Sequence, residues 1–295
     1  MNSPTTRWQR RSFLKTLGAV SATIHCGELG FLRRLPSVSA AETQLPPNAV
    51  KLSADLEPLV RLLEETPRDE IIQTFAHQIQ SGTSYRQILA ALLLAGVRNV
   101  QPRPSVGFKF HCVLVVNSVH LASMAAPEKD RWLPIFWALD YFKSAQLQDE
   151  REGNWTLPEI TSSKLPPVHK ACQAFRDAMD AWDEEAADNA VVAMCRTVGT
   201  TEAFDLMAHF GCRDYRSIGH KAIYVANSFR TLQSIGWRHA EPVLRSLAYA
   251  LLNHHGEPNP ASANLVPDAA WRVTQERLPQ LDDTWNHGRV DPKAT

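Results

Sequence analysis

The chain has 295 residues, with 31 basic and 31 acidic side chains, so its formal net charge is zero. A nucleic-acid-binding protein presents a basic face to the phosphates, whereas the chain without its first 40 residues has 25 basic and 30 acidic residues, so we expect no nucleic-acid partner. Once an N-terminal leader is removed, the remaining length suits one large domain or two small ones.

The first 40 residues have the order of an export signal. Basic residues precede a short apolar run, 16–26, and small residues at 37–40 offer a cleavage site after Ala40. The run is too short to span a bilayer, which takes about 20 apolar residues. We therefore expect 1–40 to be a signal peptide and the mature chain, with 25 basic and 30 acidic residues, to keep no stable membrane anchor.

The leader also carries a more specific pattern. The stretch RRSFLK, from Arg10 to Lys15, resembles the twin-arginine export motif, including the Phe-Leu-Lys after the arginine pair. This resemblance implies that the chain crosses the membrane already folded, with the twin-arginine translocase as its partner during export. The mature protein is then expected to be periplasmic or secreted.

Helical periodicity dominates the first part of the mature chain, 41–147. Apolar residues recur at spacings of three and four, without the alternation typical of strands. The segments with this pattern are 55–65, 68–80, 85–95, 108–124 and 131–146. We interpret 41–147 as a first helical half. A polar, proline-bearing connection follows at 148–167.

A second helical half, 168–255, follows the connection. Its first helix begins near His169, and the later helices are predicted at 186–197, 202–210, 218–233 and 241–253. The tail, 256–295, is rich in Pro, Asn and Asp and is expected to be mostly irregular, apart from a short helix at 269–277. The predicted fold class is all-α.

The two halves repeat several landmarks in the same order. A Gly-Thr pair opens a helix at 82 and again at 199, and His111 and His220 each begin a long apolar helix that carries an Asn-Ser pair. Such self-similarity predicts a duplicated multi-helix unit packed around a pseudo-two-fold axis. The alternative is chance, because Gly and Pro mark the ends of most helices.

The duplication directs attention to polar residues inside these apolar helices. His220, Tyr224 and Asn227 lie at i, i+4 and i+7, on one stripe of a helix, and His111 shares a stripe with Ser118. Buried polar stripes need partners, and two that face each other could hold a metal ion or a haem. The alternative is that each histidine is a core residue bonded to a neighbouring carbonyl.

Two charged residues also stand in apolar surroundings. Asp140 lies within WLPIFWALDYF and Arg245 within PVLRSLAYALL. Ionised groups are seldom fully buried unless they are paired or bind a ligand. We expect either an ion pair between Asp140 and Arg245 across the pseudo-axis or a role for both at a ligand or metal site.

The histidine-bearing helices also suggest a family. The stretch HKAIYVANSFRTL, from His220 to Leu232, and the helix that begins at His111 resemble the histidine-bearing helices of the questin oxidase-like family. The resemblance implies a helical protein that oxidises an aromatic or ketone substrate. It also implies that His111 and His220 have functional roles.

Two functions remain open from the sequence. Export of a folded chain is useful when a cofactor is inserted in the cytoplasm, which predicts an oxidoreductase with a metal ion or haem on His111 and His220. It is also useful when a helical core folds quickly, which predicts a cofactor-free periplasmic binding or scaffold protein. For the enzyme, the residues expected around a small-molecule ligand are Asp140, Tyr224, Asn227 and Arg245.

Overall fold

The computed structural model describes residues 35, 56–102, 108–160, 162–252, 258–260, 262–263 and 265–280. Within these ranges the regular structure is entirely helical and no strand occurs, which confirms the all-α fold class. The signal peptide and its cleavage site lie outside the described residues, apart from Leu35.

The first half is built around one buried helix, α5. Its buried residues include Ile88, Leu92 and Val97, and Ser84 caps its first turn by accepting a bond from the Gln87 backbone N–H. The α-helices of this half are α3 (Glu57–Glu65), α4 (Ile71–Gln80), α5 (Tyr85–Asn99), α6 (His111–Leu114), α7 (Val116–Ala125) and α8 (Trp132–Glu152). A 3-10 turn, η2 (Phe108–Phe110), leads directly into α6.

The second half begins after the connection and continues into the tail. Its α-helices are α9 (Ala171–Ala181), α10 (Glu184–Cys195), α11 (Thr200–Gly211), α12 (His220–Ile235), α13 (Ala240–Leu251) and α14 (Val266–Arg277). The last of these lies in the tail and is longer than the short helix expected there.

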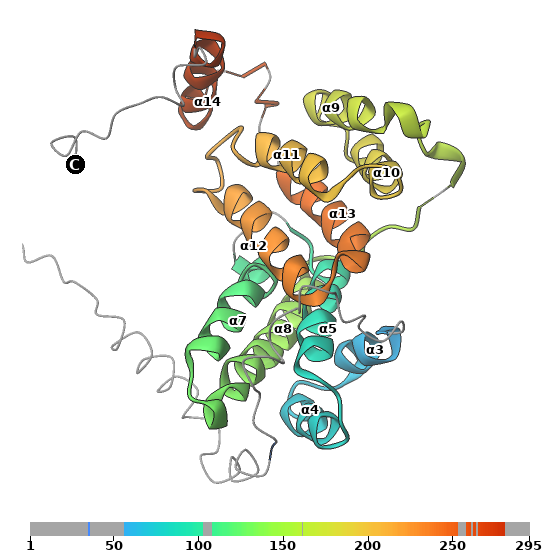
Figure 1. Cartoon of the computed structure of the whole chain (residues 1–295), viewed down its shortest axis with the longest axis vertical. Helices are drawn as coiled ribbons and strands as arrows, with labels where there is room; N and C mark the ends of the chain where they lie inside the picture. The colour runs from blue at the N-terminus through green and yellow to red at the C-terminus, as the bar shows by residue number, and fades with distance from the viewer. Residues whose placement is uncertain are drawn as a thin grey trace, which may run out of the picture.

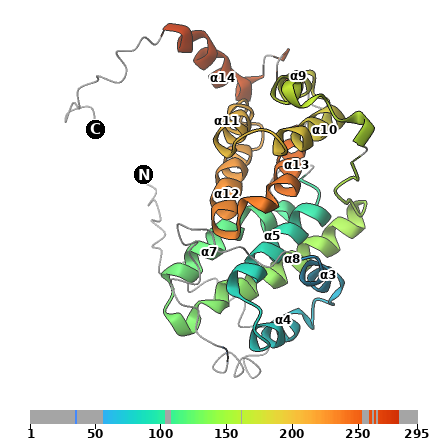
Figure 2. The same cartoon turned by 45° about the vertical axis from the view of Figure 1, so that its right-hand side comes forward.

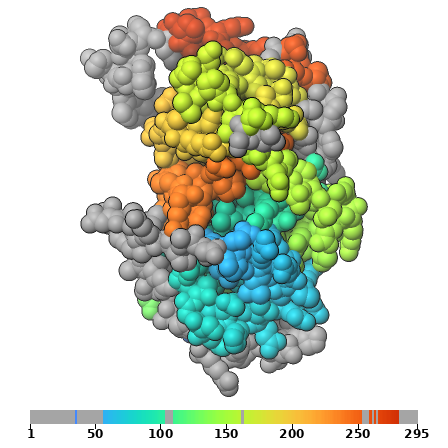
Figure 3. Space-filling view, turned by 90° about the vertical axis from the view of Figure 1, so that its right-hand side faces the viewer, coloured from blue at the N-terminus to red at the C-terminus, as the bar shows by residue number. Residues whose placement is uncertain are grey.

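The halves stack along the long axis of the molecule (Figure 1). Helix α12 packs against α5, α6 and α7, and α13 packs against α5, so these helices join the two halves. The turned view shows α14 at the far end of the second half, beyond α11 (Figure 2). From the side, α3 and α4 lie at one end of the stack and α9 to α11 towards the other (Figure 3). Buried apolar residues of both halves form a single core.

Two helices extend beyond their predicted ends. Helix α8 continues to Glu152, inside the segment expected to be the connection, and ends where Gly153 adopts φ +146°. Helix α5 passes through Gly96 instead of ending there, because this glycine serves close packing: a Cβ on it would lie 2.7 Å from Cγ2 of Val113. The predicted helix at 108–124 is interrupted at Val115, between α6 and α7.

The second half contains a matching close approach. A Cβ on Gly211, the last residue of α11, would lie 2.7 Å from Cγ2 of Val225 on α12. In both halves the absence of a Cβ on a glycine thus allows a valine of the histidine-bearing helix to pack closely against it. The shared device agrees with a duplication, which stays a prediction.

The four cysteines of the described residues are free thiols, with Cys112 buried and Cys212 exposed. None of the helices that the structure describes combines the length and hydrophobicity needed to cross a bilayer.

Candidate functional site

His111 and His220 meet between the two halves. His111 opens α6 and His220 opens α12, and their Nε2 atoms lie 3.1 Å apart. The ring centroids are 5.0 Å apart and the rings are nearly perpendicular, at 74°. Both side chains are half-buried. The structure therefore brings together the two histidines that the sequence singled out, and we call them the histidine pair.

Further polar contacts follow the histidine pair along the same interface. Asn227 donates to the carbonyl oxygen of Leu114 at 2.8 Å and accepts from the Asn117 side chain at 3.3 Å. The contacts advance in the same order along α6–α7 and α12, so these helices run parallel. The histidines face each other, and so do the two asparagines, which is the arrangement that the predicted two-fold axis would give; the axis itself stays a prediction. We call this row of contacts the polar seam.

His120 extends the polar seam towards the end of α12. Its Nδ1 lies 3.2 Å from the Tyr85 hydroxyl oxygen, and its Nε2 lies 3.4 Å from Oγ of Ser234. Burial, and secondarily the charge of Arg86, lowers the pKa of His120 below its ordinary value. This neutral histidine is thus a bonded residue of the interface, away from the histidine pair.

The hydrogen bonds of His220 decide where its proton lies. Nδ1 is 2.6 Å from the carbonyl oxygen of Ser217, and since a carbonyl can only accept, Nδ1 carries a proton. In the neutral ring Nε2 is then a lone pair directed at His111. Without a metal, His111 completes the contact by donating from its own Nε2.

The distance between the two Nε2 atoms also suits a shared metal ion. Two nitrogens about 2.0–2.1 Å from one ion are ~2.9 Å apart at a right angle and ~3.3 Å apart at the tetrahedral angle. The observed 3.1 Å lies between these values. The pair would thus suit two neighbouring nitrogen ligands of one metal ion. The Ser217 carbonyl on Nδ1 is a typical support for a metal-binding histidine.

The histidine pair has no third ligand of the usual kinds among the described residues, where no group of three or more His, Cys, Asp or Glu is placed to hold a metal ion. Zinc in proteins takes four ligands, and a catalytic site usually has three from the protein. A metal on the pair would therefore leave several coordination positions to other donors.

Tyr224 shares the helical stripe of His220 but lies deeper. It is 1% exposed, its hydroxyl donates to Oγ of Ser246 on α13 at 3.1 Å, and Phe110 packs edge-on against its ring. Burial raises the pKa of its hydroxyl above the ordinary value. Tyr224 thus joins α12 to α13 within the core.

The expected ion pair between Asp140 and Arg245 is wrong. Asp140 forms two bonds with Arg68, at 2.8 and 2.9 Å, and both side chains are substantially exposed. The neighbours of Asp140 in the sequence are apolar, which suggested that it is buried. One side of α8 faces outward, however, and Asp140 lies there, only partly buried. Neither charge therefore faces the other across the interface.

Arg245 is buried, as its surroundings suggested, but its partner is Asp188 on α10. The guanidinium donates to the two carboxylate oxygens at 2.6 and 2.9 Å, and the Tyr249 hydroxyl adds a bond of 3.2 Å. The sequence contained a signal for this partner, because Asp188 stands among the alanines and valines of α10. Ser217, which bonds to His220, and Asn117, which bonds to Asn227, were also not predicted as site residues.

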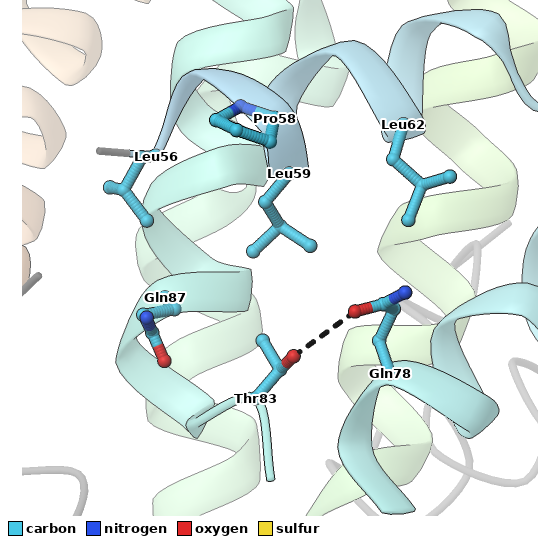
Figure 4. A pocket seen from close by; sticks show the side chains of 7 residues that line it. All are labelled: Leu56, Pro58, Leu59, Leu62, Gln78, Thr83 and Gln87. Carbon is cyan, nitrogen blue, oxygen red and sulfur yellow. Dashed lines mark hydrogen bonds between the residues drawn. The ribbon is translucent and has the colours of Figure 1, made fainter. Parts of the chain in front are cut away.

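A hollow of about 270 Å³ lies between α3, α4 and α5. Figure 4 shows Leu59 and Leu62 of α3 above it, with Thr83 below donating to the Gln78 side chain at 3.3 Å. None of the six predicted site residues lines this hollow.

Comparison of the chain with models of known families, with functionally described proteins and with solved structures gives no match.

Proposed function

We propose that the protein is an exported oxidoreductase that holds a transition-metal ion between its halves on Nε2 of His111 and Nε2 of His220. The observation that carries the proposal is the 3.1 Å separation of these atoms, on two helices from different halves. Imidazole ligates iron, copper and zinc alike. Redox chemistry would require iron or copper.

The arrangement around the pair supports this role. The Ser217 carbonyl fixes the ring of His220 with Nε2 as its lone pair, which is the form that a metal requires. Asn227 and Asn117 join α12 to α7 further along the polar seam and hold the two helices in register. The few ligands from the protein would leave positions at which a small-molecule substrate could bind the ion.

The leader supports the same proposal. An export motif for folded proteins suits a cofactor that is inserted before export, and its location would be the periplasm or the exterior. The resemblance of the two histidine-bearing helices to the questin oxidase-like family favours an aromatic or ketone substrate. Asp140, Tyr224 and Arg245 are left out of the proposed site because each is engaged elsewhere.

The test is metal analysis and absorption spectroscopy of protein purified from its own host. We expect a stoichiometric metal ion in the wild type and its loss in His111→Ala and His220→Ala. His77→Ala, at an exposed histidine of α4, is the matched control and should retain the metal. Metal-free wild-type protein, or full retention in both pair variants, would contradict the proposal.

Export is tested separately. Replacing Arg10 and Arg11 by lysine should stop export, because the twin-arginine translocase requires the arginine pair. Unchanged export of the variant, or of the wild type in a strain that lacks this translocase, would rule out the assignment.

The second candidate is a cofactor-free helical binding or scaffold protein of the same location. The observation that favours it is that the histidines and asparagines of the polar seam already bond to each other across the interface. In that case the seam would serve to align the halves. The purified protein would be colourless and metal-free, and it would lose stability in both pair variants.

A further inference from the structure

Residues 214–219, which precede α12, determine how His220 is presented. We call this segment the 214–219 loop. Its Ser217 carbonyl oxygen accepts from the His220 backbone N–H at 2.9 Å and from the ring Nδ1 at 2.6 Å. The position of this one carbonyl group therefore sets the direction in which Nε2 of His220 points.

The same loop contains strained backbone. Ile218 has φ +46° and Gly219 has φ +88°, both in the left-handed region. Glycine adopts this region readily, whereas a β-branched residue there is a genuine outlier. Ile218 is 82% exposed, so packing of its side chain does not hold it in place. Such a conformation persists only where the surrounding structure over-determines it.

Helix α14 supplies one set of restraints. Arg216 forms two bonds with Asp268, at 3.0 and 2.6 Å, and both side chains are almost fully buried. The Tyr215 backbone N–H donates to the Pro267 carbonyl oxygen at 3.2 Å. Of the 12 residues of α14, all of which the structure describes, only Asp268 is buried. Asp268 is thus the one buried anchor of this helix, and the Trp271 ring adds an edge-on contact with His209 of α11, at 4.7 Å between the ring centroids.

A second restraint comes from α12 itself. Lys221 lies next to His220 and donates from Nζ to the Asp214 carboxylate at 2.7 Å and to the Leu251 carbonyl oxygen at 3.1 Å. Both members of the ion pair are buried. The 214–219 loop is therefore held at its start by Lys221 and in its middle by α14, with the strained Ile218 two residues before His220.

We propose that α14 is a positioning element for the histidine pair, and that Asp268 holds the 214–219 loop in the strained form that aims Nε2 of His220 at His111. Without the Asp268–Arg216 bonds, Ile218 relaxes out of the left-handed region and the Ser217 carbonyl moves away from Nδ1. The ring then loses its fixed tautomer. The consequence for metal binding rests on the proposed function, whereas the consequence for the tautomer does not.

The test compares Asp268→Asn with Glu276→Gln, an equivalent change at an exposed residue of the same helix. The first readout is the ring tautomer of His220 in the metal-free full-length mature protein, from nitrogen NMR shifts. The second is a titration with Co²⁺ alone, followed by its visible absorption. We expect Asp268→Asn to lose the pure Nδ1–H tautomer and to bind Co²⁺ about tenfold more weakly, as for other supports of metal ligands. Glu276→Gln should match the wild type in both.

A second substitution separates positioning from general damage. Asparagine tolerates the left-handed region far better than isoleucine, so Ile218→Asn removes the need for a restraint. In the Asp268→Asn background it should restore the Nδ1–H tautomer and most of the Co²⁺ affinity. A double variant that stays as impaired as Asp268→Asn would overturn the proposal.

The outcomes also distinguish the two proposals. If Co²⁺ binds neither to the wild type nor to any variant while the tautomer changes as expected, the metal proposal fails and the positioning role of α14 stands. If Asp268→Asn keeps both the tautomer and the wild-type Co²⁺ affinity, the positioning role is wrong whatever the protein binds.

Discussion

The two histidines of the pair occupy counterpart places but are held by different means. His111 follows the η2 turn, in which Lys109 forms a buried ion pair with Asp149 near the end of α8, at 2.8 Å. His220 follows the strained 214–219 loop, which is restrained by Lys221 and by α14. Each thus lies close in sequence to a buried lysine–aspartate pair.

If the halves are copies, as the sequence predicts, the difference shows where they are free to diverge. At the interface both helices must present matching groups, because each group is the other's hydrogen-bond partner. Behind the interface any restraint that fixes the helix start is sufficient. In the first half this restraint lies within the helical core, and in the second half the tail adds a restraint to the one from Lys221. The first histidine should therefore be lost with the fold, whereas the second can be released locally.

The largest expected effect on stability comes from removing the restraint of the first half. Asp149 is 1% exposed and accepts from Lys109 and from the backbone N–H groups of Gln101 and Trp155. Asp149→Ala would leave a buried ammonium without its buried partner, so we expect a loss of about 3–5 kcal/mol in unfolding free energy. Denaturant titration measures it.

Glu152→Ala is the matched control, because this carboxylate binds the same Lys109 but is 40% exposed. Its loss should cost ~0–1 kcal/mol. Equal losses in the two variants would show that burial does not govern this restraint.

The next effect tests the shared device of the halves. Gly96→Ala and Gly211→Ala each place a Cβ 2.7 Å from a valine Cγ2, on a side chain that is stiff in a helix. Overpacking costs ~1–3 kcal/mol, and the gain in helix propensity offsets up to ~1 kcal/mol of it. We expect similar destabilisation from both. If Val113→Ala restores the stability of Gly96→Ala, the clash with the valine is the cause of the loss. If Gly211→Ala has the stability of the wild type, the two glycines do not serve the same role.

A smaller effect concerns pH and the far end of the polar seam. The pKa of His120 is lowered in the folded protein, so between this pKa and about 6.5 the unfolded chain binds more protons than the folded chain. Stability should therefore fall as the pH drops from about 6.5. The slope contributed by one such group is at most about 1.4 kcal/mol per pH unit.

His120→Gln should flatten this dependence, since glutamine can bond to Tyr85 without titrating. Unfolding free energies between pH 7 and pH 5 measure it. His77→Gln, at an exposed position, is the control. An unchanged slope in His120→Gln would assign the acid sensitivity to other groups.

The smallest expected effect is an increase in stability. Ile218→Asn relieves a positive φ at an exposed side chain and should stabilise the protein by about 1 kcal/mol. The melting temperature should rise accordingly. Leu121→Asn, at an exposed position of α7 with ordinary helical backbone, is a control that should give no gain. A loss of stability at Ile218 would mean that the loop stores no strain there.

Much of the fold could be predicted from local pattern. Apolar spacing located the helices, and His111 and His220 were identified because polar groups in apolar helices need partners. Helix ends were less certain, since Gly96 has the sequence signature of a terminus but serves close packing inside α5. Asp140 was misassigned for a similar reason, because an apolar sequence context does not state which side of α8 faces solvent.

The sequence by itself determined the helical class, the candidate export signal and the choice of the two histidines, because periodicity and residue type are local properties of the chain. The tertiary structure decided which groups meet. It placed Nε2 of His111 against Nε2 of His220, and it paired Arg245 with Asp188 and Arg216 with Asp268. These partners are distant in the chain, and they meet because the packing of apolar faces fixes how helices cross. Hydrogen bonds and ion pairs then form between the polar groups that this packing brings together.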